Sequence, residues 1–494
     1  MRSHMVPLLT AVLCVTTLPS HAQTKTPVTT DNGTPPAVTP VLPQTPLPSR
    51  PVPKSGTGQP AAQALPAAPA QIRQLPDALT QAPAIPSNAP SLTVAQAEQE
   101  ALTHNPQITI ARLLALAQGQ VTREQRAAEF PVIAGNVTAV GADDGSRLTA
   151  GALNNPTLYQ RAAAGITLNQ ILTDFGRTRN LIASARSRAQ AADSTLAATR
   201  EDIVFSVDEA FYRALGAQAL IQVATQTVNA RQATSNQIQA LTKARLRSTL
   251  DLSFANAALA QAQLLLLDAR NQSASAQAAL AALLGDDSGV VYRLIDETPT
   301  APPTAPAEAA PLIKLAFDSR PDLTSLKQQA DAAHKFASAE RDLSLPTVTA
   351  LGAAGDAPVR SSGIASQAYG AVGINVNIPI FNGFLFSARS NEAKFRATAA
   401  DAQVLQLRDA ITRDVTTTVL QAQSNFNRIA VAQQLAEQAN SALSLAQTRY
   451  NLGLSSIVEL SQAQLLQTQA QIELQNARYA YQGSLSAIKY QTGQ

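Results

Sequence analysis

Residues 372–383 read VGINVNIPIFNG, and residues 384–450 then run on without a Pro or a Gly. Apolar side chains occupy every second position of the first stretch, at Val372, Ile374, Val376 and Ile378. This alternation predicts a β-strand with one apolar and one polar face. In the second stretch apolar residues recur every three or four positions, which predicts a helix of ~68 residues and ~100 Å at ~1.5 Å per residue. A strand that leads directly into a helix of this length decides the fold.

The same arrangement occurs earlier in the chain, where residues 162–176 read AAAGITLNQILTDFG and precede a second long helical stretch. Similar residues recur 208 positions apart: Leu172 and Ile380, Ile203 and Ile411, Leu246 and Leu454, Asp251 and Glu459, Gly285 and Gly493. One such match carries little weight, but a constant offset over this length indicates an internal duplication. We therefore expect two internal repeats.

Each repeat is predicted to contain a helix, a β-hairpin, a long helix and a return helix. The predicted first helices cover 93–129 and 321–344, the long helices 176–243 and 383–450, and the return helices 251–284 and 457–492. Asp143-Asp144-Gly145 and Gly355-Asp356-Ala357-Pro358 have the residue types of turns and are expected to connect the strands. The repeats span 91–285 and 319–494, and a Pro-rich linker covers 286–318.

The first 90 residues read as two segments outside the repeats. Residues 1–22 have the basic start, apolar centre and small residues of a secretory signal peptide. Residues 23–90 hold sixteen of the 30 prolines, which predicts an extended, disordered tether. No segment after the signal peptide is expected to form a membrane-spanning helix, because none has ~18 uncharged apolar residues in a row.

The composition excludes several classes of function. A net charge of +3 and an aromatic content of 4% argue against nucleic-acid binding. The only Cys, Cys14, lies in the signal peptide, and the four His are far apart. We therefore expect no metal site, no cofactor and no catalytic set, so the protein is not expected to be an enzyme.

Four strands are too few to close a membrane barrel, for which eight is near the practical minimum. Strands with one apolar and one polar face fit a wall between lipid and water. Closure then requires several protomers, and the long helices must continue the same tube. The expected fold class is an α+β membrane protein in which each protomer gives four strands to a β-barrel that is continuous with a long α-helical barrel.

Several motifs resemble those of the TolC-like outer-membrane efflux protein family, also called outer membrane factors. They are the helix starts Asn105-Pro106 and Arg320-Pro321, the junctions at 170–176 and 378–383, and the return turn Arg449-Tyr450-Asn451-Leu452-Gly453-Leu454. The resemblance covers residues 91–494. It implies a homotrimer in the outer membrane with 12 strands and with helices that extend into the periplasm. It also implies a periplasmic adaptor and an inner-membrane transporter as partners in efflux or type I secretion of small toxic molecules or proteins.

The resemblance also assigns functional residues to the turns between the long and return helices. The adaptor-docking tips would contain Leu452, Gly453 and Leu454 and, in the first repeat, Arg245 and Leu246, where Arg245 stands in place of the family's Gly. Asp251, Tyr450 and Glu459 match residues that hold the pore closed, and three copies of Glu459 would form a ring that attracts cations. Ser455 and Gln462 stand where the best-known members carry a basic residue and a second acid.

Two other classes remain open from the residues. An elongated coiled-coil structural protein of the cell envelope would explain the long helices and the tether, but not paired amphipathic strands at matching places. A soluble secreted enzyme has no recognisable site in this sequence.

Overall fold

The computed structural model describes residues 89–141, 161–286, 289–297, 305–359 and 367–494, which all belong to one compact unit, 71–494. The predicted signal peptide, almost all of the predicted tether and the Asp143-Asp144-Gly145 turn lie outside these ranges. The described part is mostly helical. Its elements in chain order are β1 (Ser91–Leu92), α2 (Val94–His104), α3 (Pro106–Arg126), a 3-10 turn (Ala127–Glu129), β2 (Val132–Val140), β3 (Arg161–Thr173), α4 (Arg177–Lys243), α5 (Thr249–Leu284), β4 (Arg293–Leu294), α6 (Ala309–Ser319), α7 (Pro321–Arg341), a 3-10 turn (Asp342–Ser344), β5 (Thr347–Val359), β6 (Ala368–Asn377), α8 (Leu385–Asn451) and α9 (Ile457–Thr492).

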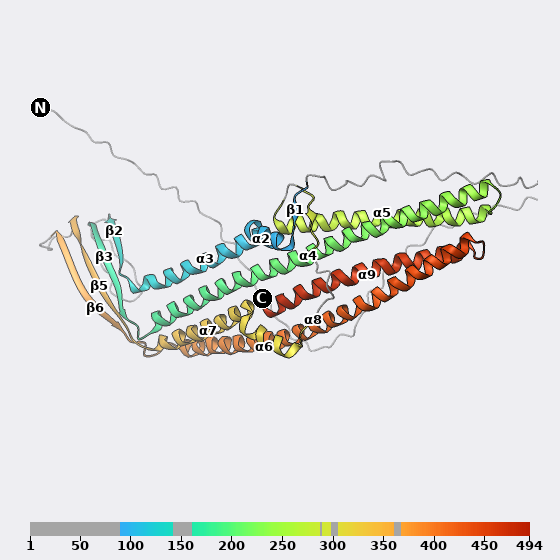
Figure 1. Ribbon diagram of the computed structural model, residues 1–494. Coiled ribbons are helices and arrows are strands. Elements are labelled where there is room, and N and C mark those ends of the chain that lie inside the picture. The colour runs from blue at the N-terminus through green and yellow to red at the C-terminus, as the bar shows by residue number, and fades with distance from the viewer. Residues whose placement is uncertain (1–88, 142–160, 287–288, 298–304, 360–366) are drawn as a thin grey trace, which may run out of the picture. The chain divides into compact units, whose positions relative to one another are not determined.

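Strands from both halves of the chain form one antiparallel sheet in the order β2-β3-β5-β6 (Figure 1). The central pairing joins β3 of the first half to β5 of the second, and Gly165 lies opposite Gly355. Within the described residues, strands β2 and β6 are the two edges, each paired on one side only. The sheet exposes large apolar residues along both edge strands, Val137 and Val372 among them.

The prediction of a turn at Gly355-Asp356-Ala357-Pro358 is wrong, because β5 continues through these residues to Val359. The glycine serves the sheet instead. Gly355 pairs with Tyr369 on one side and Gly165 on the other, and a Cβ at Gly355 would lie 2.6 Å from the Cζ of the Tyr369 ring. The Tyr369 side chain therefore takes the space above two facing glycines, where any larger side chain would collide with it.

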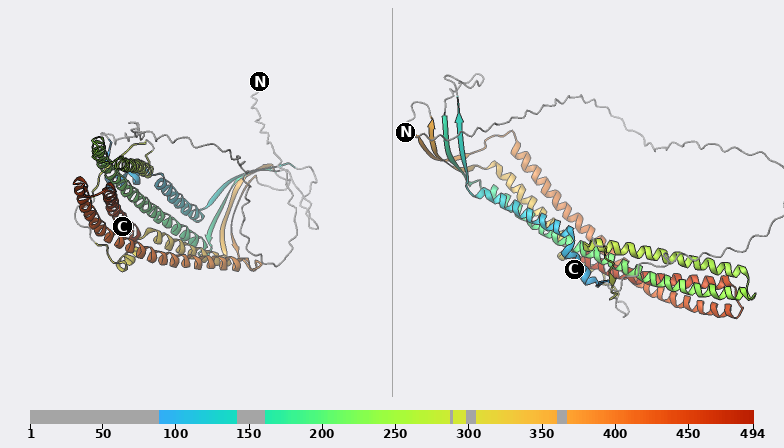
Figure 2. Two further views of the ribbon diagram at one scale, coloured as in Figure 1. Left: turned by 90° about the vertical axis from the view of Figure 1, so that its right-hand side faces the viewer. Right: turned by 90° about the horizontal axis from the view of Figure 1, so that it is seen from above.

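Helices α4 and α8 each contain 67 residues, and each turns back into a 36-residue helix, α5 or α9. At ~1.5 Å per residue the long helices extend ~100 Å. Each hairpin packs along its own length, and α4 also packs against α7 and α9 (Figure 2). Many of the buried residues of α8 are alanines, including Ala393, Ala422 and Ala439. Such small side chains allow the helix axes to approach closely.

A left-handed backbone residue redirects the chain where a strand passes into a long helix. Gly176 (φ 117°) precedes α4, and the carboxylate of Asp174 accepts hydrogen bonds from the amide and hydroxyl of Thr178, at 2.7 and 2.6 Å. Gly383 (φ 62°) and Phe384 (φ 65°) occupy the same place before α8. The sheet and the helix turns therefore lie at opposite ends of α4 and α8 (Figure 1).

The predicted single helix over 93–129 is divided at Asn105, with α2 before it and α3 after it. Asn105 precedes a proline and has an extended backbone (φ −64°, ψ 124°), as expected for such a residue. Its side chain accepts from the amide of Gln107 at 2.8 Å and donates to the carbonyl of Leu283 at 2.9 Å. The cap therefore starts α3 and also ties it to the end of α5.

The predicted linker 286–318 contains regular structure as well. Strand β4 pairs in parallel with β1, and α6 covers Ala309–Ser319 with Pro311 in its first turn. Proline is tolerated there because that backbone nitrogen has no acceptor within the helix. Helix α6 packs on α8 and α9, so part of this segment belongs to the helical layer.

Among the described residues, α5 alone is long and apolar enough, by length and composition, to span a membrane. The expectation that no segment forms a membrane-spanning helix stays a prediction, since this criterion measures only length and composition. Only 22% of its apolar window is buried within the chain. Leu264 (61% exposed) lies on this uncovered apolar face of α5.

Candidate functional site

The candidate site is formed by the two turns at the end of the hairpins farthest from the sheet (Figure 2). The first turn joins α4 to α5 across 244–248, and the second joins α8 to α9 across 452–456. All the site residues predicted from the sequence lie in these turns or in the adjoining helix ends.

The first turn ends α4 with two hydrogen bonds that redirect the chain. The amide of Arg245 donates to the carbonyl of Thr242 at 3.0 Å, and the amide of Leu246 donates to that of Leu241 at 2.8 Å. This pair of bonds is the Schellman motif, which satisfies the free carbonyls at a helix end. The motif places the residue after the helix cap, here Arg245, in the left-handed region, with φ 58°.

The second turn repeats this geometry. Gly453 (φ 75°) and Leu454 donate to the carbonyls of Tyr450 and Arg449 at 3.0 and 2.8 Å. The two turns therefore have the same backbone, although one has Arg245 where the other has glycine. A left-handed conformation costs a residue with a Cβ roughly 1–2 kcal/mol, which glycine avoids. The first turn bears this cost and places a guanidinium at the tip.

Both predicted gate acids stand at the third residue of a return helix. The hydroxyl of Ser248 accepts from the amide of Asp251 at 3.1 Å, and that of Ser456 accepts from the amide of Glu459 at 3.4 Å. Serine at the cap and an acid in the first turn are both favourable at a helix start, since they satisfy free amides and oppose the positive end of the helix dipole. Capping alone therefore gives both acids a structural role.

Tyr450 is buried between the two hairpins, with 1% of its surface exposed. The guanidinium of Arg247 lies 4.5 Å from the centre of its ring, and Nη2 of Arg247 donates to the carbonyl oxygen of Tyr450 at 2.9 Å. Burial raises the pKa of Tyr450, the Arg247 charge opposes this and the Asp251 charge adds to it. The cluster around the ring draws on all four helices and contains Ile238, Ala255, Ala446, Ile457 and Leu460.

The structure thus brings Asp251 and Tyr450 close to Arg247, which was not predicted as a site residue from the sequence. The sequence does contain a signal for Arg247, because Arg247 and Ser455 lie 208 residues apart and so occupy equivalent positions in the two halves. Ser455 is the position at which a basic residue was expected by resemblance. In this chain the cation comes from the first turn.

Glu459 of α9 pairs with Arg449 of α8. Its Oε1 is 3.4 Å from Nε of Arg449, and both side chains are roughly half exposed. An exposed ion pair of this kind contributes at most about 1 kcal/mol. The Glu459 carboxylate therefore remains accessible to solvent and to passing ions.

The predicted docking leucines are highly exposed. The fractions are 71% for Leu246, 68% for Leu452 and 67% for Leu454. Three leucines so exposed at the ends of two hairpins form an apolar tip, which marks a surface that a partner can cover. Within the described residues, no group of three or more His, Cys, Asp or Glu side chains is arranged to hold a metal ion.

Comparison with known proteins gives the family. Residues 97–286 and 312–494 match the family described as outer membrane efflux protein. Outer membrane protein TolC of Salmonella enteritidis is 22% identical over 424 residues, which cover 81% of this chain and 83% of TolC. TolC of Vibrio cholerae is 24% identical over 341 residues, covering 67% of this chain and 76% of its own length.

Solved structures share the fold. CusC, in which conformational changes accompany folding and transmembrane channel formation, matches with a TM-score of 0.72 at 20% identity, covering 81% of this chain and 92% of CusC. The outer membrane protein VceC of Vibrio cholerae matches with a TM-score of 0.68 at 21% identity, covering 81% and 96%. The fold is therefore that of outer-membrane channel proteins. The chain belongs to the outer membrane efflux protein family, and it is a TolC-like protein of the outer membrane with helices that extend into the periplasm.

Proposed function

We propose that three copies of this chain form one channel, with a 12-stranded β-barrel in the outer membrane and a helical barrel in the periplasm. The observation that carries the proposal is the open sheet β2-β3-β5-β6 with its two edge strands. Backbone amides and carbonyls cannot be left unpaired in lipid, so an open sheet must close. Pairing β6 of one copy with β2 of the next would close it.

Exposed apolar side chains support the same arrangement. On the edge strands, Val137 is 86% exposed and Val372 is 93% exposed, which suits contact with lipid. Leu114 of α3, Leu264 of α5 and Leu420 of α8 are also more than half exposed. In the trimer neighbouring helices would cover these side chains, and this explains the apolar face of α5 without a membrane span.

The channel is proposed to act with a periplasmic adaptor and an inner-membrane transporter. The adaptor would cover Leu246, Leu452 and Leu454, with Arg245 and Gly453 setting the turns that present them. Asp251, Tyr450 and Glu459 would hold the periplasmic entrance closed. Burial of Tyr450 between the hairpins supports this, because separating the hairpins would expose its ring.

The cargo class is proposed to be small toxic molecules or secreted proteins. The inner surface would be rich in Gln, Asn and Ser, since the chain is only 14% charged. Neutral polar groups exchange hydrogen bonds with many solutes and hold none of them tightly. This composition suits a passage and argues against a catalytic role.

We also infer that residues 91–285 and 319–494 arose by duplication. The long helices and the return helices have equal lengths in the two halves, and the turns have matching hydrogen bonds. The signal peptide and the Pro-rich tether belong to the proposal as well, since export across the inner membrane must precede insertion.

Conductance in a planar bilayer tests the channel most directly. The full chain, extracted from the outer membrane in detergent, should have the mass of a trimer by native mass spectrometry and should conduct ions after reconstitution. A matched preparation with Val372→Asp, a charge on the exposed face of edge strand β6, should insert poorly. A salt-soluble monomer without conductance would refute the proposal.

A further inference from the structure

A cavity of about 550 Å³ lies between the two hairpins, on the sheet side of the turns described above. Helices α4, α8 and α9 line it with mostly neutral hydrogen-bonding side chains. These include Gln226, Thr227, Gln447, Gln467, Thr468 and Gln471. Among the described residues that line it, Arg231 of α4 is the one with a charge. The cavity therefore combines room for a small ligand, many polar groups and one cation.

Arg231 is buried, with 7% of its surface exposed. One of its nitrogens, Nη1, donates to Oε1 of Gln464 on α9, and Nε2 of Gln464 donates to the hydroxyl of Thr234 at 3.3 Å. Within the described part of the chain, Arg231 has no carboxylate within 4.0 Å. Its only side-chain partner there is a neutral amide.

An unpaired guanidinium in such a place is unusual. Removing a charged group from water costs several kcal/mol unless an opposite charge or a full set of hydrogen bonds compensates it. Burial lowers the pKa of Arg231, and no carboxylate acts against that effect. Arginine nevertheless keeps its proton at neutral pH, because its ordinary pKa is above ~12. The positive charge is therefore present and uncompensated.

A negatively charged ligand would compensate the charge of Arg231. A guanidinium presents a planar set of donors that matches the paired oxygens of a carboxylate, sulfate or phosphate. The amides and hydroxyls around it can donate to the other oxygens of such an ion. A cation ligand is disfavoured by Arg231, and an apolar ligand would leave the lining groups without partners.

We propose that this cavity is a binding site for a small oxyanion, held by Arg231 and the neutral polar side chains of α4, α8 and α9. Because these helices come from different hairpins, a bound ion contacts both hairpins and stabilises their packing in each chain. The proposal needs only the fold of the single chain. It stands or falls independently of the channel function proposed above.

Inorganic sulfate is the first probe. The full-length protein in detergent and chloride buffer is titrated with sodium sulfate against sodium chloride at equal ionic strength, and binding is followed by calorimetry and by the unfolding midpoint. We expect saturable binding of one sulfate per chain, with a rise in the midpoint that chloride does not produce. Acetate in the same assay tells whether the site prefers a carboxylate or a tetrahedral ion.

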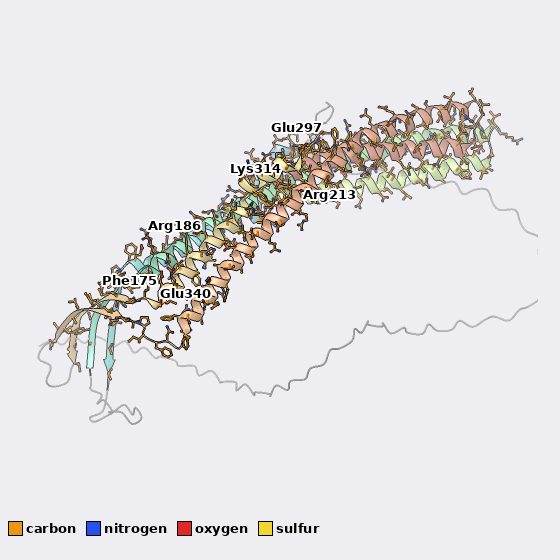
Figure 3. The ribbon with its side chains drawn as sticks, turned by 90° about the horizontal axis from the view of Figure 1, so that it is seen from below. Phe175, Arg186, Arg213, Glu297, Lys314 and Glu340 are labelled. Carbon is orange, nitrogen blue, oxygen red and sulfur yellow. The ribbon has the colours of Figure 1, made fainter. Side chains whose placement is uncertain are left out.

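Two variants and a control locate the site. Arg231→Gln should weaken sulfate binding by about tenfold or more, since it removes the only cation. Gln464→Glu keeps Arg231 and gives it an internal carboxylate, so this variant should fold at least as well and lose the response to sulfate. Arg213, labelled in Figure 3, is an exposed arginine of the same helix and pairs with Glu209. The control Arg213→Gln should therefore bind sulfate like the unchanged protein. Absence of saturable binding, or equal binding by all four proteins, would overturn the proposal.

Discussion

Replacing Arg247 by Met should open the proposed channel. Arg247 is in the first turn, and its two contacts are to Tyr450 in the other hairpin: the ring at 4.5 Å and the carbonyl oxygen at 2.9 Å. A partly exposed cation–π contact contributes about 1 kcal/mol, and a hydrogen bond from a charged donor contributes about 1.5 kcal/mol. Met keeps the apolar stem and removes both contacts. A loss of about 2.5 kcal/mol corresponds to a roughly 70-fold change in an equilibrium between closed and open hairpins.

Single-channel recording in planar bilayers measures this equilibrium as open probability. If the hairpins separate on opening, Arg247→Met should raise a low open probability by up to roughly 70-fold. Arg247→Lys should restore part of the closure, because it keeps the charge and one donor. Arg213→Met is the matched control, since that arginine is exposed and pairs only within α4. An effect of Arg247→Met no larger than that of the control would refute the reasoning.

Three further predictions concern charge, strain and pH. Glu459→Gln should lower the preference for cations measured from reversal potentials, and unchanged selectivity would exclude a ring of charge at this position. Arg245→Gly should raise the free energy of unfolding by about 0.5–1 kcal/mol, because relief of the left-handed residue exceeds the added freedom of the unfolded chain; a lower unfolding midpoint would contradict this. Burial, together with the hydrogen bond and charge of Asp208, raises the pKa of Glu98 from 4.5 to about 7. The folded chain therefore binds the Glu98 proton more tightly than the unfolded chain does. Protonated Glu98 contributes to the free energy of unfolding in full below pH ~4.5, and this contribution is lost as the pH rises through about 7. Amide exchange in α2, corrected for intrinsic rates, should accelerate over that interval in the unchanged protein and not in Glu98→Gln; parallel profiles would count against it.

The long elements could be predicted from the sequence because their signals are local and repeated. The four helices of the hairpins begin and end within two residues of the predicted bounds. Periodic apolar residues and an absence of Pro are sufficient for helices of this length, even though α4 contains Gly216 and α9 contains Gly483. Caps at Ser248 and Ser456 and the left-handed Gly453 then mark the ends.

Features that depend on distant contacts were harder to predict. Gly355 has the residue type of a turn, yet its role is set by Tyr369 on the neighbouring strand. The break at Asn105 is different, because a residue before proline is a local signal for a helix boundary and is visible in the sequence. For the candidate site, the positions of the two turns could be predicted from the sequence. The contact between Arg247 and Tyr450 did not, because 203 residues separate the two in the chain.

The unpaired edges of β2 and β6 have a genetic consequence. In the proposed trimer every barrel contains β6–β2 pairings between different polypeptides. One chain with a defective edge strand therefore prevents closure of the barrel that it forms with two normal chains. A cell that makes equal amounts of normal and edge-defective chains would build only about an eighth of its barrels wholly from normal ones. Alleles that damage these strands while sparing association of the helices should therefore be dominant, whereas alleles that prevent association altogether should be recessive.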